Sequence, residues 1–206
     1  MELDGLRLLP GYFDPAAQRR LVDEVLAAAE AAPFYVPRLP RTGAPMSVTQ
    51  TNFGSLGWVT DQARGYRYEA VHPQTGSPWP PIPQALLDLW AEASGYAAAP
   101  EACLVNLYRD NARMGLHQDA DEAAQDAPVV SVSLGDTAVF RVGGARRNDP
   151  TRSFRLTSGD VVVLGGTARE FFHGVDRVIE GSSRVVPGGG RINLTLRRVT
   201  KPQRTA

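Results

Sequence analysis

Arg191-Ile192-Asn193-Leu194-Thr195-Leu196-Arg197 alternates strictly between polar and aliphatic residues and is the clearest strand signal in the chain. A period of two predicts a β-strand, with one face made of Ile192, Leu194 and Leu196. The opposite face carries Arg191, Asn193, Thr195 and Arg197. Faces of this kind are common on edge strands that are open to solvent. The face also suits a dicarboxylate ligand, because arginine binds carboxylates through two parallel hydrogen bonds.

Short strands separated by turns fill the chain from residue 102 onward. The turn chemistry lies at Gly143-Gly144, Asn148-Asp149-Pro150 and Ser158-Gly159-Asp160. The predicted strands cover residues 102–108, 129–134, 137–142, 152–157, 160–164, 173–179 and 191–199. Many short strands in succession favour a sandwich or barrel, so we expect a mainly β domain with flanking helices, of the α+β class.

Two helices are predicted before these strands. The first covers residues 14–32, with Asp14 as N-cap, Pro15 at the first helical position and an apolar stripe of Leu21, Val22, Val25 and Leu26. The second covers residues 83–94, with Gly95 as C-cap and three buried residues, Leu86, Leu87 and Trp90. Residues 36–82 show little periodicity and are predicted to form a long loop, which in a compact domain is often functional.

Composition indicates a soluble globular protein that acts in a reducing compartment. Apolar residues make up 43% of the 206 residues and charged residues 21%, both ordinary values for one compact domain. The single cysteine, Cys103, lies in an apolar run and is expected to be a buried thiol. The N-terminus lacks a targeting pattern, and aliphatic runs such as 161–164 are too short to cross a bilayer. We therefore expect a cytoplasmic monomer with no membrane contact.

Charge is distributed unevenly along the chain although the formal net charge is zero. Residues 1–140 carry 9 arginines and 17 acidic residues, whereas residues 141–206 carry 13 basic and 5 acidic residues. These basic residues are either scattered over a solvated surface or positioned to contact phosphates. The distribution alone favours the first interpretation.

A candidate metal site combines His117-Gln118-Asp119 with the distant His173. Residues at i and i+2 of an extended segment point to the same face, so His117 and Asp119 are predicted to lie together. Two histidines and one carboxylate are the ligand set of non-haem Fe(II), which leaves coordination positions open. The pattern His-x-Asp also occurs by chance in many proteins. His72, which is followed by a proline, is predicted to be an exposed loop histidine.

Asn106 and Tyr108 are a second pair of polar residues at i and i+2 on a predicted strand. Their side chains share one face of that strand. They form either a satisfied buried pair or part of a ligand site.

Several segments resemble the AlkB family of nucleic-acid dealkylases. The first group is Cys103-Leu-Val-Asn-Leu-Tyr108 with His117-Gln-Asp-Ala-Asp-Glu122. The second is Pro128-Val-Val-Ser-Val-Ser-Leu-Gly135, Gly143-Gly-Ala-Arg-Arg-Asn-Asp-Pro150 and Gly159-Asp-Val-Val-Val-Leu-Gly-Gly166. The third is the alternating segment 191–197. Further similarity lies at Met46-Ser-Val-Thr, Leu56-Gly-Trp-Val-Thr60, Pro73-Gln-Thr-Gly76 and Pro78-Trp-Pro80, so the resemblance covers most of residues 46–198.

The resemblance implies a double-stranded β-helix, or jelly roll, in residues 99–200. Residues 1–98 would supply helices and a nucleotide-recognition lid packed on this core as one structural unit. The implied iron ligands are His117, Asp119 and His173. The residues implied to bind 2-oxoglutarate are Asn106, Tyr108, Arg191, Asn193 and Arg197, with Thr195 on the same strand face. The residues implied to contact the substrate are Trp58, Tyr66, Asp121 and Arg147.

The function implied is oxidative removal of alkyl groups from bases such as 1-methyladenine and 3-methylcytosine in DNA. Fe(II), 2-oxoglutarate and O₂ would be consumed, and succinate, CO₂ and an aldehyde released. The expected partner is single-stranded or locally opened DNA, with RNA as a weaker substrate. The alternatives are the same chemistry on RNA or on a protein side chain, and a jelly-roll binding module without turnover. Leu107 and Leu164 depart from the better-known members, which carry arginine and tryptophan there.

Overall fold

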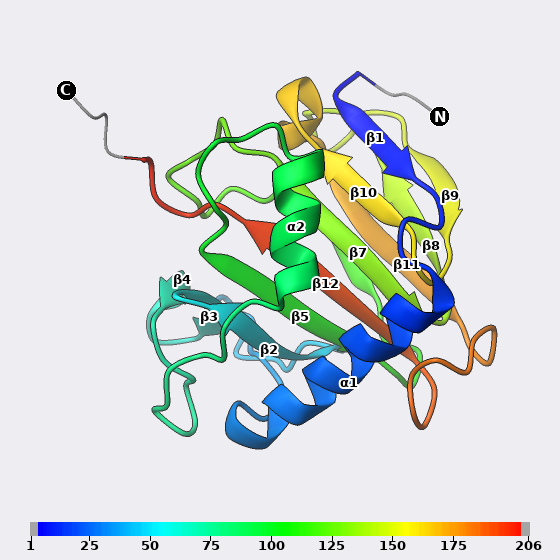
Figure 1. The fold of residues 1–206 in the computed structure, drawn as a ribbon. Coiled ribbons are helices and arrows are strands. Elements are labelled where there is room, and N and C mark those ends of the chain that lie inside the picture. Colours follow the sequence, from blue (N-terminus) through cyan, green and yellow to red (C-terminus); the bar gives the residue numbers. More distant parts are fainter. Residues whose placement is uncertain (1–3, 203–206) are drawn as a thin grey trace.

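Residues 4–202 are described by a computed structural model, in which two antiparallel sheets face each other (Figure 1). The larger sheet has six strands in the order β1-β10-β7-β12-β5-β2. Their bounds are β1 Leu6–Leu9, β10 Val161–Leu164, β7 Val129–Gly135, β12 Arg191–Arg197, β5 Ala102–Tyr108 and β2 Thr49–Gly54. Neighbours in this order are distant in sequence, as in a jelly roll.

The smaller sheet has four strands in the order β6-β11-β8-β9. Their bounds are β6 Met114–His117, β11 His173–Ile179, β8 Thr137–Val142 and β9 Arg152–Leu156. A buried cluster that includes Val142, Val162 and Leu164 fills the space between the two sheets. The predicted jelly-roll core is therefore confirmed, and all seven strands predicted from residue 102 onward are present within a few residues of their expected ends.

Two helices cover the outer face of the larger sheet (Figure 1). Helix α1 spans Pro15–Ala31, and the Asp14 carboxylate accepts a hydrogen bond from the Ala17 amide at 2.7 Å. Helix α2 spans Gln84–Ala93, and Gly95 follows it with a φ of +67°. The predicted apolar stripes are each wrong at one position, because Leu26 is exposed and Leu87 is only partly buried. No helix within residues 4–202 is long and apolar enough to cross a membrane.

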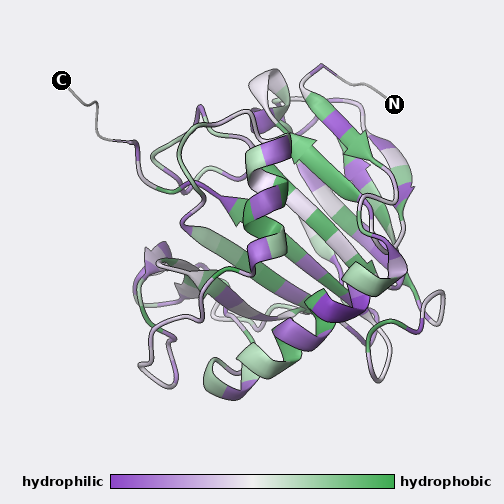
Figure 2. Ribbon diagram, viewed as in Figure 1, coloured by the Kyte–Doolittle hydropathy of each residue, from purple (hydrophilic) through white to green (hydrophobic). Residues whose placement is uncertain are grey.

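Strand β12 lies in the middle of the larger sheet, between β7 and β5. All seven of its residues are buried, which excludes a solvated edge strand. Its aliphatic residues pack in the core cluster that contains Leu86 and Trp90 of α2. Figure 2 shows hydrophilic and hydrophobic positions alternating along several strands of this sheet, whereas β10 is apolar throughout. The polar face of β12 therefore points into the space between the sheets.

Residues 36–82 are not one long loop, contrary to the sequence-based prediction. Strand β2 joins the larger sheet beside β5, and β3 (Gly57–Asp61) pairs with β4 (Gly65–Glu69) as a hairpin. We call β3, β4 and their turn the recognition hairpin, after the role that the family resemblance implies for this region. Strand β2 was missed because its polar residues Gln50, Thr51 and Asn52 are all buried, which conceals the usual alternation. The short strands β1 and β6 were missed as well.

His72 is buried, with 1% of its surface exposed, so its prediction as an exposed residue was wrong. Its Nε2 lies 2.8 Å from the carbonyl oxygen of Pro33, and its Nδ1 accepts hydrogen bonds from the amides of Gln74 and Thr75. The ring also packs edge-on against Trp79. His72 thus fastens residues 72–79 to the end of α1.

Candidate metal and co-substrate site

Three metal-donor side chains converge where the smaller sheet meets the loop that follows β6. His117 ends β6, Asp119 lies two residues further on, and His173 begins β11 directly opposite His117 in the strand register. One ligand atom from each lies within 4.8 Å of the other two. The Nε2 atoms of His117 and His173 lie 4.0 and 3.7 Å from the Asp119 carboxylate oxygens.

Backbone hydrogen bonds orient both imidazole rings toward this point. The Nδ1 of His117 lies 2.9 Å from the carbonyl oxygen of Gly115, and that of His173 lies 3.0 Å from the carbonyl oxygen of Phe171. A proton on each Nδ1 satisfies these contacts and leaves the Nε2 lone pairs free to bind a metal.

Asp119 and His173 are held in the charge states that bind a cation. Burial alone would raise the pKa of the Asp119 carboxyl, but Arg197 and the two histidines lower it well below its usual range. Burial and the neighbouring His117 lower the pKa of His173 to about 4, so His173 is neutral near pH 7. Among residues 4–202, the buried Asp119 Oδ2 has no hydrogen-bond partner. The three donors thus fit a divalent metal, and the set of two histidines and one carboxylate fits Fe(II).

The polar face of β12 extends from Arg197, beside the metal donors, to the buried Arg191 at the other end of the strand. Arg191 is 1% exposed, its Nη2 donates to Ser133 Oγ at 2.9 Å, and its guanidinium lies 5.1 Å from the centre of the Tyr108 ring. Its Nε and Nη1 have no hydrogen-bond partner in the part of the chain that the structure describes. Burial lowers the pKa of Arg191, because a buried positive charge without a negative partner is unfavourable. A carboxylate at this position would satisfy both the spare donors and the charge.

The other residues predicted on this face lie between Arg191 and the metal donors. Asn193 Nδ2 donates to Ser131 Oγ and the Val132 carbonyl oxygen, and Thr195 Oγ1 donates to Asn193 Oδ1. Asn106 and Tyr108 lie opposite Asn193 and Arg191 in the register of β5 and β12. At the end of β12 nearest the metal donors, Arg197 Nη2 donates to Asp119 Oδ1 at 2.6 Å. The predicted metal and co-substrate residues therefore form one continuous site.

The structure also brings together three of the predicted substrate residues. The rings of Trp58 and Tyr66 are stacked with centroids 5.4 Å apart, and Trp58 Nε1 donates to Asp121 Oδ2 at 2.7 Å. Arg147 lies apart from them, where its Nη1 donates to the Leu116 carbonyl oxygen beside His117. Its guanidinium also lies 5.8 Å from the centre of the Phe172 ring.

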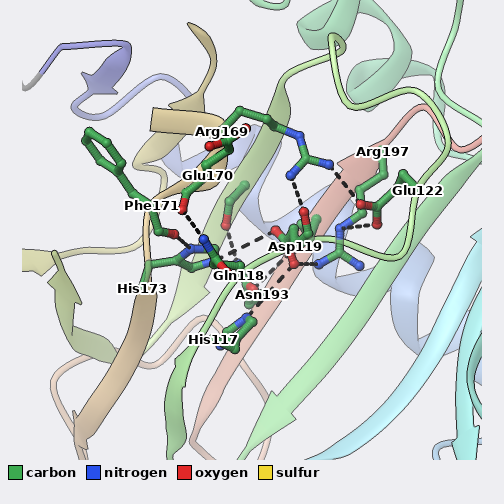
Figure 3. A network of polar contacts seen from close by, with 12 residues as sticks. His117, Gln118, Asp119, Glu122, Arg169, Glu170, Phe171, His173, Asn193 and Arg197 are labelled. Atoms are coloured by element: carbon green, nitrogen blue, oxygen red, sulfur yellow. Dashed lines mark hydrogen bonds and ion pairs between the residues drawn. The ribbon is translucent and has the colours of Figure 1, made fainter. Parts of the chain in front are cut away.

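Sequence reasoning assigned no role to four polar residues around the metal donors: Tyr68, Gln118, Glu122 and Arg169 (Figure 3 labels the last three). Glu122 and Arg169 lie outside the strands, so no periodic pattern predicts their burial. Their proximity to His117 and His173 in the sequence was the only available signal.

A jelly roll that places two histidines and a carboxylate beside a buried arginine-bearing strand defines a non-haem Fe(II), 2-oxoglutarate-dependent oxygenase. A model of the 2OG-Fe(II) oxygenase superfamily matches residues 5–197. An "Alpha-ketoglutarate-dependent dioxygenase AlkB homolog" of Caulobacter vibrioides is 63% identical over 94% of this chain and 87% of its own length. The "Alpha-ketoglutarate-dependent dioxygenase AlkB" of Escherichia coli K12 is 42% identical over 91% and 87%.

This chain belongs to the AlkB family of that superfamily. Among solved structures, "The structure of OsALKBH1" superimposes with a TM-score of 0.81 at 28% identity and covers 96% of this chain and 98% of that one. The protein is therefore an Fe(II)- and 2-oxoglutarate-dependent dioxygenase, and the alternative of a binding module without turnover is excluded.

Proposed function

We propose that this enzyme removes alkyl groups from the ring nitrogens of nucleobases, with 1-methyladenine and 3-methylcytosine in single-stranded or locally opened DNA as its preferred substrates. RNA is the weaker substrate in this proposal. The proposed metal ligands are His117, Asp119 and His173. The proposal also assigns the stacked pair Trp58 and Tyr66 to base binding.

One observation carries the substrate assignment: the recognition hairpin contacts the loop that bears Asp119 at two points. Trp58 Nε1 of β3 donates to Asp121 Oδ2 at 2.7 Å, and the hydroxyl of Tyr68 on β4 donates to Glu122. These contacts hold aromatic rings close to the metal donors. Aromatic faces stack with nucleobases, and each stacked base contributes about 1–3 kcal/mol to binding.

The site suits a base that carries positive charge. Methylation at N1 of adenine or N3 of cytosine makes the base cationic, and a cation over an aromatic face is attracted to it. His117 keeps 40% of its side chain exposed, and in this proposal its ring packs against the other face of the base. The Asp121 carboxylate lies where it would accept from the exocyclic amine or balance the charge.

The chain's own residues would hold each reactant in a fixed place. Arg191 and Tyr108 would bind the distal carboxylate of 2-oxoglutarate, with Asn106, Asn193, Thr195 and Arg197 arranged along the rest of the molecule. The metal, when bound, supplies oxidation of the substrate's alkyl carbon by O₂ coupled to decarboxylation of 2-oxoglutarate. The hydroxylated alkyl group then leaves the base nitrogen as an aldehyde.

The nucleic acid strand must present an unpaired base, because the target nitrogen is otherwise on the pairing edge inside the duplex. Arg147 and Arg152 are exposed near the metal donors, and Arg152 pairs in register with Val142, which in turn pairs with His173. These arginines are the proposed contacts for phosphates that flank the extruded base.

The test compares initial rates of formaldehyde release on matched substrates. Oligonucleotides carrying 1-methyladenine, its neutral isomer N6-methyladenine or 3-methylcytosine are presented as single-stranded DNA, duplex DNA and RNA, with a methylated peptide as control. We expect the highest rates on the two cationic lesions in single-stranded DNA. Release from the peptide with none from any nucleic acid would contradict the proposal.

A further inference from the structure

Two buried arginines, Arg169 and Arg197, share the carboxylate of Glu122 beside the metal donors (Figure 3). Arg169 Nη2 lies 2.8 Å from Glu122 Oε2, and Arg197 Nε lies 3.5 Å from Glu122 Oε1. Both arginines also contact Asp119: Arg197 its carboxylate, and Arg169 its backbone carbonyl. The four residues form a closed ring of polar contacts that includes one proposed metal ligand.

Arg169 contacts the loop 118–127 at three points. Its Nη1 donates to the Asp119 carbonyl oxygen, its Nη2 to Glu122 and its Nε to the Ala127 carbonyl oxygen at 3.0 Å. Only 4% of Arg169 is exposed. A buried arginine whose donors reach three positions of one loop is suited to fixing the path of that loop.

The later part of this loop is held by the amides of Ala123 and Ala124, which donate to the Val199 carbonyl oxygen, but no such backbone contact within residues 4–202 holds Asp119 itself. Strand β6 ends at His117, so Asp119 has no strand partner that fixes its position. Arg169 belongs to the short 3-10 helix η1 (Gly166–Glu170), which leads directly into His173. Gln118 adds a second link, because its Nε2 donates to the Glu170 carbonyl oxygen at 2.5 Å. Helix η1, just before His173, is therefore bound to the loop that carries Asp119.

The charges explain why the ring needs Arg169. The four side chains are two cations and two anions, all nearly buried. Without Arg169, the two carboxylates would share one cation of the ring, Arg197, although Glu122 would keep the hydrogen bond from the Tyr68 hydroxyl. Glu122 would then draw the Arg197 guanidinium away from Asp119, and its own charge would remain buried with a weaker partner, which is costly.

We propose that Arg169, acting with Glu122, is a positioning residue that holds Asp119 in the geometry required for metal binding. The proposal rests on the metal-ligand set assigned above and does not depend on the identity of the substrate. The ring extends to the recognition hairpin, because the Tyr68 hydroxyl donates to Glu122 and accepts from Arg197 Nη1 at 3.4 Å. The hairpin and the metal ligand are therefore held by the same carboxylate.

The test measures the affinity for Mn(II), by electron paramagnetic resonance, in the absence of nucleic acid and 2-oxoglutarate. We expect Arg169→Met to weaken Mn(II) binding by about 10- to 100-fold, the usual effect of removing a residue that orients a ligand. Arg169→Lys should recover part of this loss, because lysine keeps the positive charge but cannot reproduce the three hydrogen bonds of the guanidinium to the loop. The matched control is Arg141→Met, which removes a partly exposed arginine paired with Asp176 on the smaller sheet.

A double variant separates positioning from stability. Arg169→Met with Glu122→Leu removes both charges, so its melting temperature should approach that of the unmodified protein. Its Mn(II) affinity should stay low, because the hydrogen bonds from Arg169 to the Asp119 and Ala127 carbonyl oxygens are still lost. Unchanged Mn(II) affinity in Arg169→Met or in the double variant, with His173→Ala unable to bind Mn(II), would overturn this inference alone. Normal Mn(II) binding in His173→Ala would instead overturn the ligand set itself.

Discussion

Arg197 Nη2 lies 2.6 Å from Asp119 Oδ1, so the polar face of β12 directly contacts one of the three proposed metal ligands. Arg191 lies six residues earlier on the same strand face, at the opposite end of the buried space. The two arginines therefore lie on one strand, and that strand contacts a metal donor at one of its ends. In the proposed function, this arrangement would orient an extended dicarboxylate between the metal donors and Arg191.

Loss of a metal ligand should abolish turnover without unfolding the protein. His173→Ala and Asp119→Asn are expected to lose succinate formation and Mn(II) binding, because the first removes a donor and the second replaces the anionic carboxylate with a neutral amide. The jelly-roll core does not depend on these side chains, so circular dichroism should remain unchanged. Normal turnover in His173→Ala would exclude His173 from the ligand set.

Arg191→Met should lose 2-oxoglutarate binding while the free protein becomes no less stable. Arg191 is fully buried, and no carboxylate of residues 4–202 pairs with it, so methionine removes an unpaired buried charge. The affinity for 2-oxoglutarate should fall by about 2–5 kcal/mol, as when one partner of a buried charge pair is removed.

Calorimetry on the Mn(II) form measures this affinity, and thermal unfolding without 2-oxoglutarate measures stability. Arg184→Met, at an exposed arginine before β12, is the control and should change neither value. Unchanged affinity in Arg191→Met would contradict the assignment of the distal carboxylate.

Two substitutions of Trp58 distinguish stacking from its hydrogen bond to Asp121. Trp58→Ala should weaken binding of a 1-methyladenine oligonucleotide by about 1–3 kcal/mol, because the stacking face is lost. Trp58→Phe keeps an aromatic face and loses the indole N–H, so a smaller loss of about 0.5–1.5 kcal/mol is expected. Succinate formation without nucleic acid should persist in both variants. Equal binding by all three proteins would remove Trp58 from the base site.

Arg147→Gln should reduce the salt dependence of oligonucleotide binding. Each lost phosphate contact lowers the slope of log K against log salt by about 0.7 for a single strand. Arg20→Gln, at an exposed position on α1, removes the same charge and should leave the slope unchanged. Fluorescence anisotropy over a salt series provides the measurement, and an identical slope for both variants would reject the phosphate contact.

Much of the fold could be predicted because its strands alternate or are continuously apolar. Strand β12 shows the limit of such reasoning, since the alternation predicted a strand but not that its polar face is buried. Strand β2 could not be predicted, because Gln50, Thr51 and Asn52 are buried through hydrogen bonds rather than through apolar character.

The candidate site was likewise predictable from the sequence only in part. The spacing of His117 and Asp119 indicated a shared site, although Asp119 lies in a loop after β6 and not on the extended segment that was expected. Arg169 and Glu122 carry no pattern that predicts burial, because their environment is created by segments that meet only in the folded chain. Tertiary contacts, not local sequence, place them beside Asp119.

The most direct measurement is a stoichiometry on single-stranded DNA that contains one 1-methyladenine, with Fe(II), 2-oxoglutarate and O₂. Mass spectrometry quantifies restored adenine, and parallel assays quantify succinate and formaldehyde. Equal amounts of restored adenine and formaldehyde, with at least as much succinate, are the predicted result, and all three should be absent with His173→Ala. Succinate that accumulates without restored adenine, while a methylated peptide releases formaldehyde, would contradict nucleobase dealkylation and retain only the oxygenase chemistry.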